Sequence, residues 1–213
     1  MQLINRNEHG IFYVDGSHLF ACIERVKRDH PELASSKLNI ERLTFNLITI
    51  FRNFIGSGIR ITYYFRKDDD RIKKYLTISP LHGLHGHWQI KQCGYNLRRS
   101  KAILASELDK LSEEYRDIYP RAEKGVDMEL ACDALSLAAG RTAQSFVFLI
   151  DDRDYLPLLQ AIQRFGANTY IVGLDIKQKV QDSILELADS YLTLEPYLYD
   201  IFDYRPPVVE SKG

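Results

Sequence analysis

The architecture of this chain follows from one segment, Phe146-Val147-Phe148-Leu149-Ile150-Asp151-Asp152-Arg153-Asp154. Five consecutive apolar residues that end in charge predict a strand buried on both faces, as in a parallel sheet. The next residues, 155–162, have the apolar spacing of a helix. Three carboxylates therefore follow a central strand at its carboxyl end, the edge at which open parallel sheets bind ligands. Acids also favour any helix N-terminus, so this segment leaves a helix cap and a ligand site both open.

A second strand-to-helix turn, near the N-terminus, carries the same kind of acid. Residues 10–14 are apolar enough to predict a buried strand, and Asp15 follows it directly. Helical apolar spacing then begins at Leu19. We expect Gly16 to allow a tight turn and Ser17 to cap the helix. An isolated Asp at a strand end is most often a cap, but the setting of Asp15 matches that of Asp152.

The rest of the chain alternates strands and helices. Helices are predicted over 40–55, 71–81, 128–139 and 183–188, and strands over 59–65, 88–93, 168–173 and 190–194. This alternation predicts an α/β fold with a central, mostly parallel sheet flanked by helices. We expect one domain over residues 1–195 with a helical insertion at 102–120, followed by a C-terminal tail at 196–213.

Charge is unevenly distributed along the chain, although the net charge is −1. Residues 60–101 hold ten basic and three acidic side chains, a net +7. Residues 102–213 hold eleven basic and twenty acidic side chains, a net −9. This division suits a polyanion bound next to an acidic metal site, but two solvated helix faces of opposite sign would also produce it.

Targeting signals are not evident in the sequence. No apolar run approaches the roughly 18 residues needed to span a bilayer, and the N-terminus lacks the apolar core of a signal peptide. Cys22, Cys93 and Cys132 are widely spaced and form no CxxC pair. We therefore expect reduced thiols, no structural zinc, and a cytoplasmic protein without a membrane partner.

Three segments together resemble the NYN-domain family. They are, in chain order, Val14-Asp15-Gly16-Ser17-His18-Leu19, Lys124-Gly125-Val126-Asp127-Met128-Glu129-Leu130-Ala131-Cys132-Asp133 and Asp152-Arg153-Asp154-Tyr155-Leu156-Pro157-Leu158. The family comprises PIN-like, metal-dependent ribonucleases, including the LabA-like group, and the resemblance covers roughly residues 9–175. It implies a three-layer PIN-like nuclease domain. The chain departs from the usual family pattern at two places. It has His18 where the family has Asn, and it has Ile150-Asp151 where the family has Ser-Gly.

The resemblance implies four catalytic acids that bind Mg²⁺ or Mn²⁺, namely Asp15, Asp127, Asp152 and Asp154. Asp133 is a further candidate metal ligand, although its spacing of six residues places it off the Asp127 face of a helix. Phosphodiester hydrolysis needs a nucleophilic water and relief of charge on the phosphate, and cations bound by carboxylates supply both. We expect the four acids to converge on one cleft at the carboxyl edge of the sheet. We expect the run 68–70 only to open the following helix.

The predicted function is therefore that of a metal-dependent ribonuclease acting on single-stranded RNA. Aromatic and basic residues would stack bases and bind phosphates, and the candidate RNA contacts are Ser17, Lys124, Tyr95, Arg98, Arg99 and Lys101. One alternative is an RNA-binding or interaction module with a weak or lost active site, which the Ile150-Asp151 departure motivates. Another is a phosphatase, which would normally need Asp where Ser17 stands. The RNA target, the mode of cleavage and homo-oligomerisation stay open.

Overall fold

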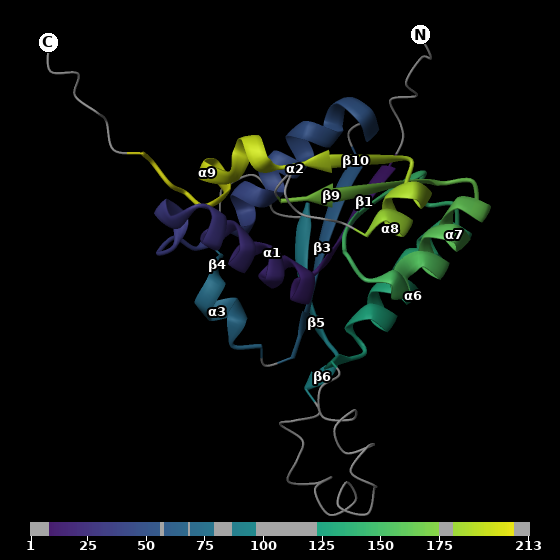
Figure 1. Cartoon of the computed structure of the whole chain (residues 1–213). Helices are drawn as coiled ribbons and strands as arrows, with labels where there is room; N and C mark the ends of the chain where they lie inside the picture. The colour runs from purple at the N-terminus through teal and green to yellow at the C-terminus, as the bar shows by residue number, and fades with distance from the viewer. Residues whose placement is uncertain are drawn as a thin grey trace, which may run out of the picture.

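A computed structural model describes residues 9–55, 58–67, 69–78, 87–96, 123–174 and 181–206. Its centre is a sheet of six parallel strands in the order β10-β9-β8-β1-β3-β5 (Figure 1). The strands are β1 (His9–Asp15), β3 (Gly58–Arg66), β5 (Trp88–Cys93), β8 (Ser145–Leu149), β9 (Asn168–Gly173) and β10 (Ser190–Thr193). Two short pairs accompany the sheet: parallel β2 (Leu38–Asn39) and β4 (Leu76–Thr77), and antiparallel β6 (Tyr95–Asn96) and β7 (Glu123–Lys124).

Helices cover both faces of the sheet (Figure 1). The first core packs α1 (Gly16–Asp29), α2 (Ile40–Ile55), α3 (Arg71–Tyr75) and α9 (Leu198–Ile201), and the second packs α6 (Val126–Ala139), α7 (Leu156–Arg164) and α8 (Asp182–Leu187). Successive strand residues alternate between these cores: Phe12 and Val14 belong to the first, Tyr13 to the second. The predicted three-layer α/β architecture is confirmed.

The sheet changes its direction of growth between β1 and β8. From β1 the chain builds outward through β3 to β5, whereas β8, β9 and β10 are added on the other side of β1. The helix after β1 packs in the first core and the helix after β8 packs in the second. Open α/β sheets bind ligands at the carboxyl ends of the strands at such a switch point. Asp15 and the acidic turn after β8 both lie there.

The helix predicted over 71–81 is shorter than expected. It ends at Tyr75, because Leu76 is buried and pairs with Leu38 in the short β2–β4 ladder. The helix predicted over 40–55 and the strand predicted over 88–93 have the expected bounds. The predicted insertion at 102–120 lies outside the described residues.

The chain beyond residue 195 contributes to the core. A 3-10 turn (Glu195–Tyr197) leads into α9, and Ile201 and Phe202 are buried against the first core. Arg42 on α2 pairs with Asp203, with 3.1 Å between Nη2 and Oδ1. The first part of the predicted tail is thus packed as far as it is described, and the domain boundary at 195 stays a prediction. None of the helices in the described ranges has both the length and the apolar character that crossing a membrane requires.

Candidate active site

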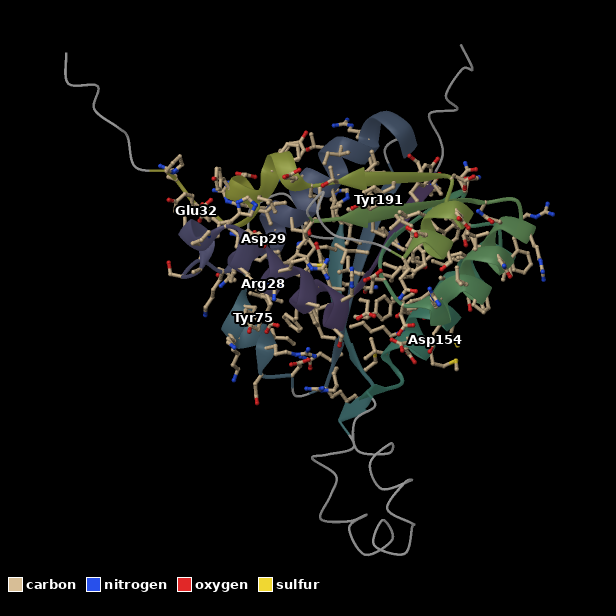
Figure 2. The ribbon with its side chains drawn as sticks, viewed as in Figure 1. Arg28, Asp29, Glu32, Tyr75, Asp154 and Tyr191 are labelled. Atoms are coloured by element: carbon tan, nitrogen blue, oxygen red, sulfur yellow. The ribbon has the colours of Figure 1, made fainter. Side chains whose placement is uncertain are left out.

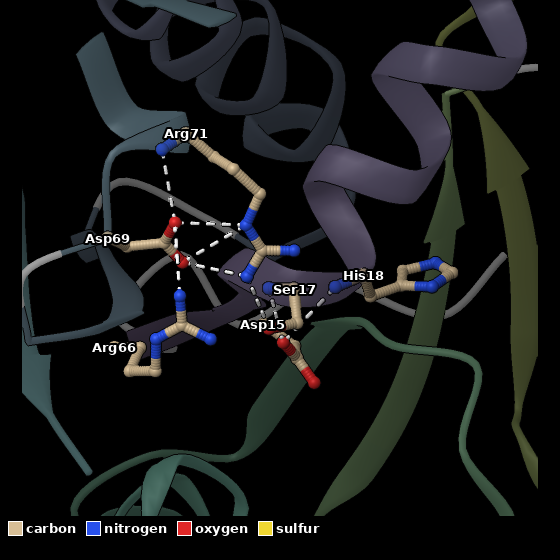
Figure 3. Close-up of polar contacts among 6 residues, drawn as sticks. All are labelled: Asp15, Ser17, His18, Arg66, Asp69 and Arg71. Carbon is tan, nitrogen blue, oxygen red and sulfur yellow. Dashed lines mark hydrogen bonds and ion pairs between the residues drawn. The ribbon is translucent and has the colours of Figure 1, made fainter. Parts of the chain in front are cut away.

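Asp15 is the last residue of β1 and the N-cap of α1, and it is 7% exposed. Its Oδ1 accepts hydrogen bonds from the backbone N–H groups of Ser17 (2.8 Å) and His18 (3.2 Å), as Figure 3 shows. Its Oδ2 accepts a hydrogen bond from the Tyr155 hydroxyl at 3.1 Å. The cap and ligand-site interpretations are therefore compatible, because one oxygen caps the helix and the other faces Tyr155.

The space for this turn depends on the glycine that follows Asp15. A Cβ on Gly16 would lie 2.2 Å from Phe65 Cδ1 and 2.5 Å from the Tyr64 carbonyl oxygen on β3. Gly16 is already the first residue of α1, and it is not one of the described glycines with positive φ. The turn is tight as expected, because β1 ends at Asp15 and α1 begins at Gly16, but it does not use a positive φ. The glycine is needed because α1 begins in contact with the β3 backbone.

One hydroxyl joins two of the predicted catalytic acids. Tyr155 ends the 3-10 turn Arg153–Tyr155 after β8 and is buried. Its hydroxyl lies 3.1 Å from Asp15 Oδ2 and 3.0 Å from Asp127 Oδ1. Because a phenol carries a single proton, it can donate to only one of the two carboxylates at a time.

Asp127, which contacts the Tyr155 hydroxyl, lies in the first turn of α6. The preceding Gly125 has a φ of 102°, and a Cβ there would lie 3.1 Å from Gly94 Cα. Only glycine accepts this backbone conformation readily. The close contact with Gly94 ties the start of α6 to the segment that follows β5.

Burial makes the site unfavourable for negative charge. The pKa of Asp15 is raised to about 6: burial is the largest cause and the charge of Asp127 adds to the rise, while the N–H groups of His18 and Ser17 and the Tyr155 hydroxyl oppose it. Burial, together with both carboxylates, also raises the pKa of Tyr155. Tyr155 therefore stays protonated and acts as a hydrogen-bond donor. Two carboxylates that share one proton favour the binding of a cation or a second proton.

The acids after β8 divide into two groups. Asp152 caps the 3-10 turn, its Oδ1 accepting the Asp154 N–H at 3.0 Å, and both side chains are exposed; Asp154 is labelled in Figure 2. Asp151 instead accepts the backbone N–H of Gln181 at 3.0 Å, which ties it to the start of α8. The Ile150-Asp151 departure therefore supplies a structural contact to α8.

Asp133 lies in a separate cluster on α6. It accepts hydrogen bonds from the Tyr64 hydroxyl (2.6 Å) and from Lys91 Nζ (2.8 Å). Lys91 also pairs with Glu129 at 2.8 Å. Asp133 is thus off the Asp127 face, as its spacing predicted, and its charge is compensated by Lys91.

His18 stands where the family has Asn. Its Nε2 lies 3.3 Å from Cys22 Sγ one turn along α1. Burial, with a contribution from the charge of Arg25, lowers the pKa of His18 to about 4. The side chain is therefore neutral at physiological pH and adds no cation to the site.

The predicted RNA contacts are only partly within the described residues. Lys124 and Tyr95 are backbone partners in the β6–β7 ladder, so two candidates that are far apart in the sequence are adjacent at the end of β5. Ser17 lies beside Asp15, and Arg71 Nη2 donates to its Oγ at 3.3 Å. Arg98, Arg99 and Lys101 lie outside the described residues.

The donor chemistry of the pair fits a hard divalent cation. Mg²⁺ is commonly held by one or two carboxylates and retains several waters. Asp15 and Asp127 offer two such oxygens, and Asp152 and Asp154 follow the neighbouring strand at the same edge. Within the described ranges no group of three or more His, Cys, Asp or Glu side chains could hold a metal ion. Convergence of all four acids on one cleft stays a prediction.

Tyr155 is the site residue that the sequence interpretation missed. The sequence places it only in a segment with the apolar spacing of a helix, and its ring is buried among apolar side chains. The available signal was the position of this tyrosine in the sequence, directly after Asp154 and three residues after Asp152. A buried tyrosine hydroxyl usually needs a polar partner, so its position beside these acids could have identified it.

A family model described as the NYN domain matches residues 12–195 of the chain. The matched range runs from within β1 to beyond the end of β10 and includes Asp15, Asp127 and Tyr155. No curated protein and no solved structure matches the chain.

Proposed function

The chain belongs to the NYN-domain family and has its PIN-like nuclease fold, and from this premise we propose that it is a divalent-metal-dependent ribonuclease. Members of the family are generally ribonucleases, and PIN-like nucleases usually use divalent metals. In our proposal the acids Asp15, Asp127, Asp152 and Asp154 form the hydrolytic site and single-stranded RNA is the substrate.

One observation carries the proposal. Asp15 Oδ2 and Asp127 Oδ1 both lie within hydrogen-bonding distance of the Tyr155 hydroxyl, at the switch point of the sheet. A fold that only needed helix caps would have no reason to bring a second carboxylate to a buried first one. Such a pair costs stability, and a buried carboxyl with a raised pKa, as at Asp15, is typical of functional sites.

The residues of the site would have separate roles in hydrolysis. Asp15 and Asp127 would hold the cation, which when bound supplies an activated water and relieves charge on the scissile phosphate. Tyr155 acts as a positioning residue, because its protonated hydroxyl lies within hydrogen-bonding distance of both carboxylate oxygens and can donate to either one. Asp152 and Asp154 are exposed, and substrate and solvent can reach them.

The test is cleavage of an end-labelled single-stranded RNA of mixed sequence. The wild-type chain should cleave with Mg²⁺ or Mn²⁺, and EDTA should abolish cleavage. Asp127→Asn should lower the rate at least about 100-fold, since it removes a charge that acts in the transition state. Asp29→Asn is the matched control, because it makes the same change on an exposed residue at the far end of α1.

Cleavage that persists unchanged in EDTA or in the Asp127→Asn variant would refute this site. The alternative, an RNA-binding module without hydrolytic activity, makes a different prediction. It would bind the same RNA without any metal-dependent cleavage by the wild-type chain.

A further inference from the structure

A second cluster of charged side chains lies next to Asp15, at the end of β3 and on the segment after it (Figure 3). Asp69 has a side-chain exposure of only 2%. Arg71 binds it in a fork, with 2.9 Å from Nε to Oδ1 and 2.7 Å from Nη2 to Oδ2. Arg66 approaches the same carboxylate, with 3.6 Å between Nη2 and Oδ1.

This cluster contains more positive than negative charge. Two guanidinium groups surround one carboxylate, which leaves a net +1. Arg66 Nε is buried and has no hydrogen-bond partner among the described residues. Arg71 alone is sufficient to compensate the charge of the buried Asp69, so the more distant Arg66 pair leaves one positive charge in excess.

The cluster is directly connected to the acidic pair. Arg71 Nη2 donates to Ser17 Oγ at 3.3 Å, and the Ser17 N–H donates to Asp15 Oδ1 at 2.8 Å. The guanidinium plane of Arg71 also lies over the Phe20 ring, with 4.7 Å from Cζ to the ring centroid. Arg71 is therefore oriented in advance by three neighbours while 35% of its side chain stays exposed.

We propose that Arg66 and Arg71 form a phosphate-binding subsite for the RNA backbone, held in place by Asp69 beside Asp15. The inference rests on the proposed function, because it takes RNA as the substrate. A phosphodiester that approaches two carboxylates is repelled by them, and adjacent guanidinium groups offset that repulsion. Arginine suits the task because its planar fork matches the oxygens of a phosphate group.

The test measures RNA binding in EDTA, so that no hydrolysis interferes. Fluorescence anisotropy of a labelled single-stranded RNA gives the affinity over a series of KCl concentrations. The main variant is Asp69→Asn/Arg66→Gln/Arg71→Gln, which removes both cations together with the carboxylate and therefore leaves no buried charge unpaired. Arg66→Gln alone is the second variant, since it keeps the Asp69–Arg71 pair intact.

Arg28→Gln is the matched control. It changes the net charge by the same single unit as the triple variant. Arg28 is exposed in the last turn of α1, roughly 17 Å along the helix axis from Ser17. Thermal unfolding of each variant checks that the fold is retained.

The triple variant should bind RNA roughly 10- to 100-fold more weakly, as expected for lost charge-assisted hydrogen bonds. Its plot of log affinity against log salt should be shallower by about 0.7, because one phosphate contact of a single strand is lost. Arg66→Gln should change both quantities in the same direction but less, and Arg28→Gln should leave the affinity close to that of the wild type.

The proposed subsite would be overturned if the triple variant had the same RNA affinity and the same salt slope as Arg28→Gln. If the wild-type chain also cleaves RNA in that case, the subsite alone fails. If the wild type binds RNA through these arginines but does not cleave it with metal, the subsite stands and the proposed hydrolysis fails.

Discussion

Replacing Asp15 by Asn should stabilise the metal-free protein above pH 6. Burial raises the pKa of Asp15 from 3.8 to about 6. A carboxyl whose pKa is higher in the folded than in the unfolded state contributes stability that is fully present below about pH 4 and is lost as pH rises through 6. The difference between the two pKa values corresponds to roughly 3 kcal/mol at pH 8.

The asparagine fits the contacts of the aspartate it replaces. Its Oδ1 can still accept the N–H groups of Ser17 and His18, and Asn is as good an N-cap as Asp. Its amide can donate to the Tyr155 oxygen, which leaves the single Tyr155 proton for Asp127. The substitution therefore removes the buried charge without leaving an unpaired group.

The assay is urea unfolding in EDTA at several values between pH 4 and pH 8. Asp15→Asn should exceed the wild-type free energy of unfolding by roughly 3 kcal/mol at pH 8, with the gap closing toward pH 4. Asp29→Asn, the same change on an exposed residue, should stay within about 0.5 kcal/mol of wild type throughout. A variant no more stable than wild type at pH 8, or a gap independent of pH, would show that Asp15 is not a destabilising buried charge.

Three further outcomes are expected. Tyr155→Phe should lower the free energy of unfolding at pH 8 in EDTA by about 1.5–3 kcal/mol, because the buried carboxylate of Asp15 loses its hydroxyl donor; an unchanged urea midpoint would contradict this. Asp69→Asn/Asp70→Asn should leave Mn²⁺ affinity unchanged in calorimetry, since Asp69 pairs with Arg71, and a tenfold loss in a folded variant would assign these acids to the metal. Arg98→Ala/Arg99→Ala should weaken RNA binding and reduce its salt slope by about 1.4, with metal affinity retained, and an unchanged slope would place the RNA elsewhere.

The acids at the strand ends show how much of the fold the local sequence pattern predicts. Apolar runs of five residues that end in charge were enough to predict buried parallel strands and to put Asp15 and Asp152 at one edge. This works because the carboxyl ends of parallel strands necessarily share an edge, whatever side chains surround them. Helix bounds were less predictable, as α3 shows, because the pairing of Leu76 with Leu38 ended the helix early.

The contacts that define the site came only from the tertiary structure. Tyr155 and Asp15 are 140 residues apart, and no periodicity in the sequence says which hydroxyl will fill the space between two carboxylates. The run at 68–70 had a sufficient local explanation as a helix start, yet Asp69 is buried between Arg66 and Arg71. Composition and spacing therefore decided the fold and the edge at which the acids lie, because both depend on backbone geometry. Side-chain packing between distant elements decided which carboxylate oxygen faces which donor and how far the pKa of Asp15 rises. The same packing decided that the Arg71 guanidinium lies beside Ser17, next to Asp15.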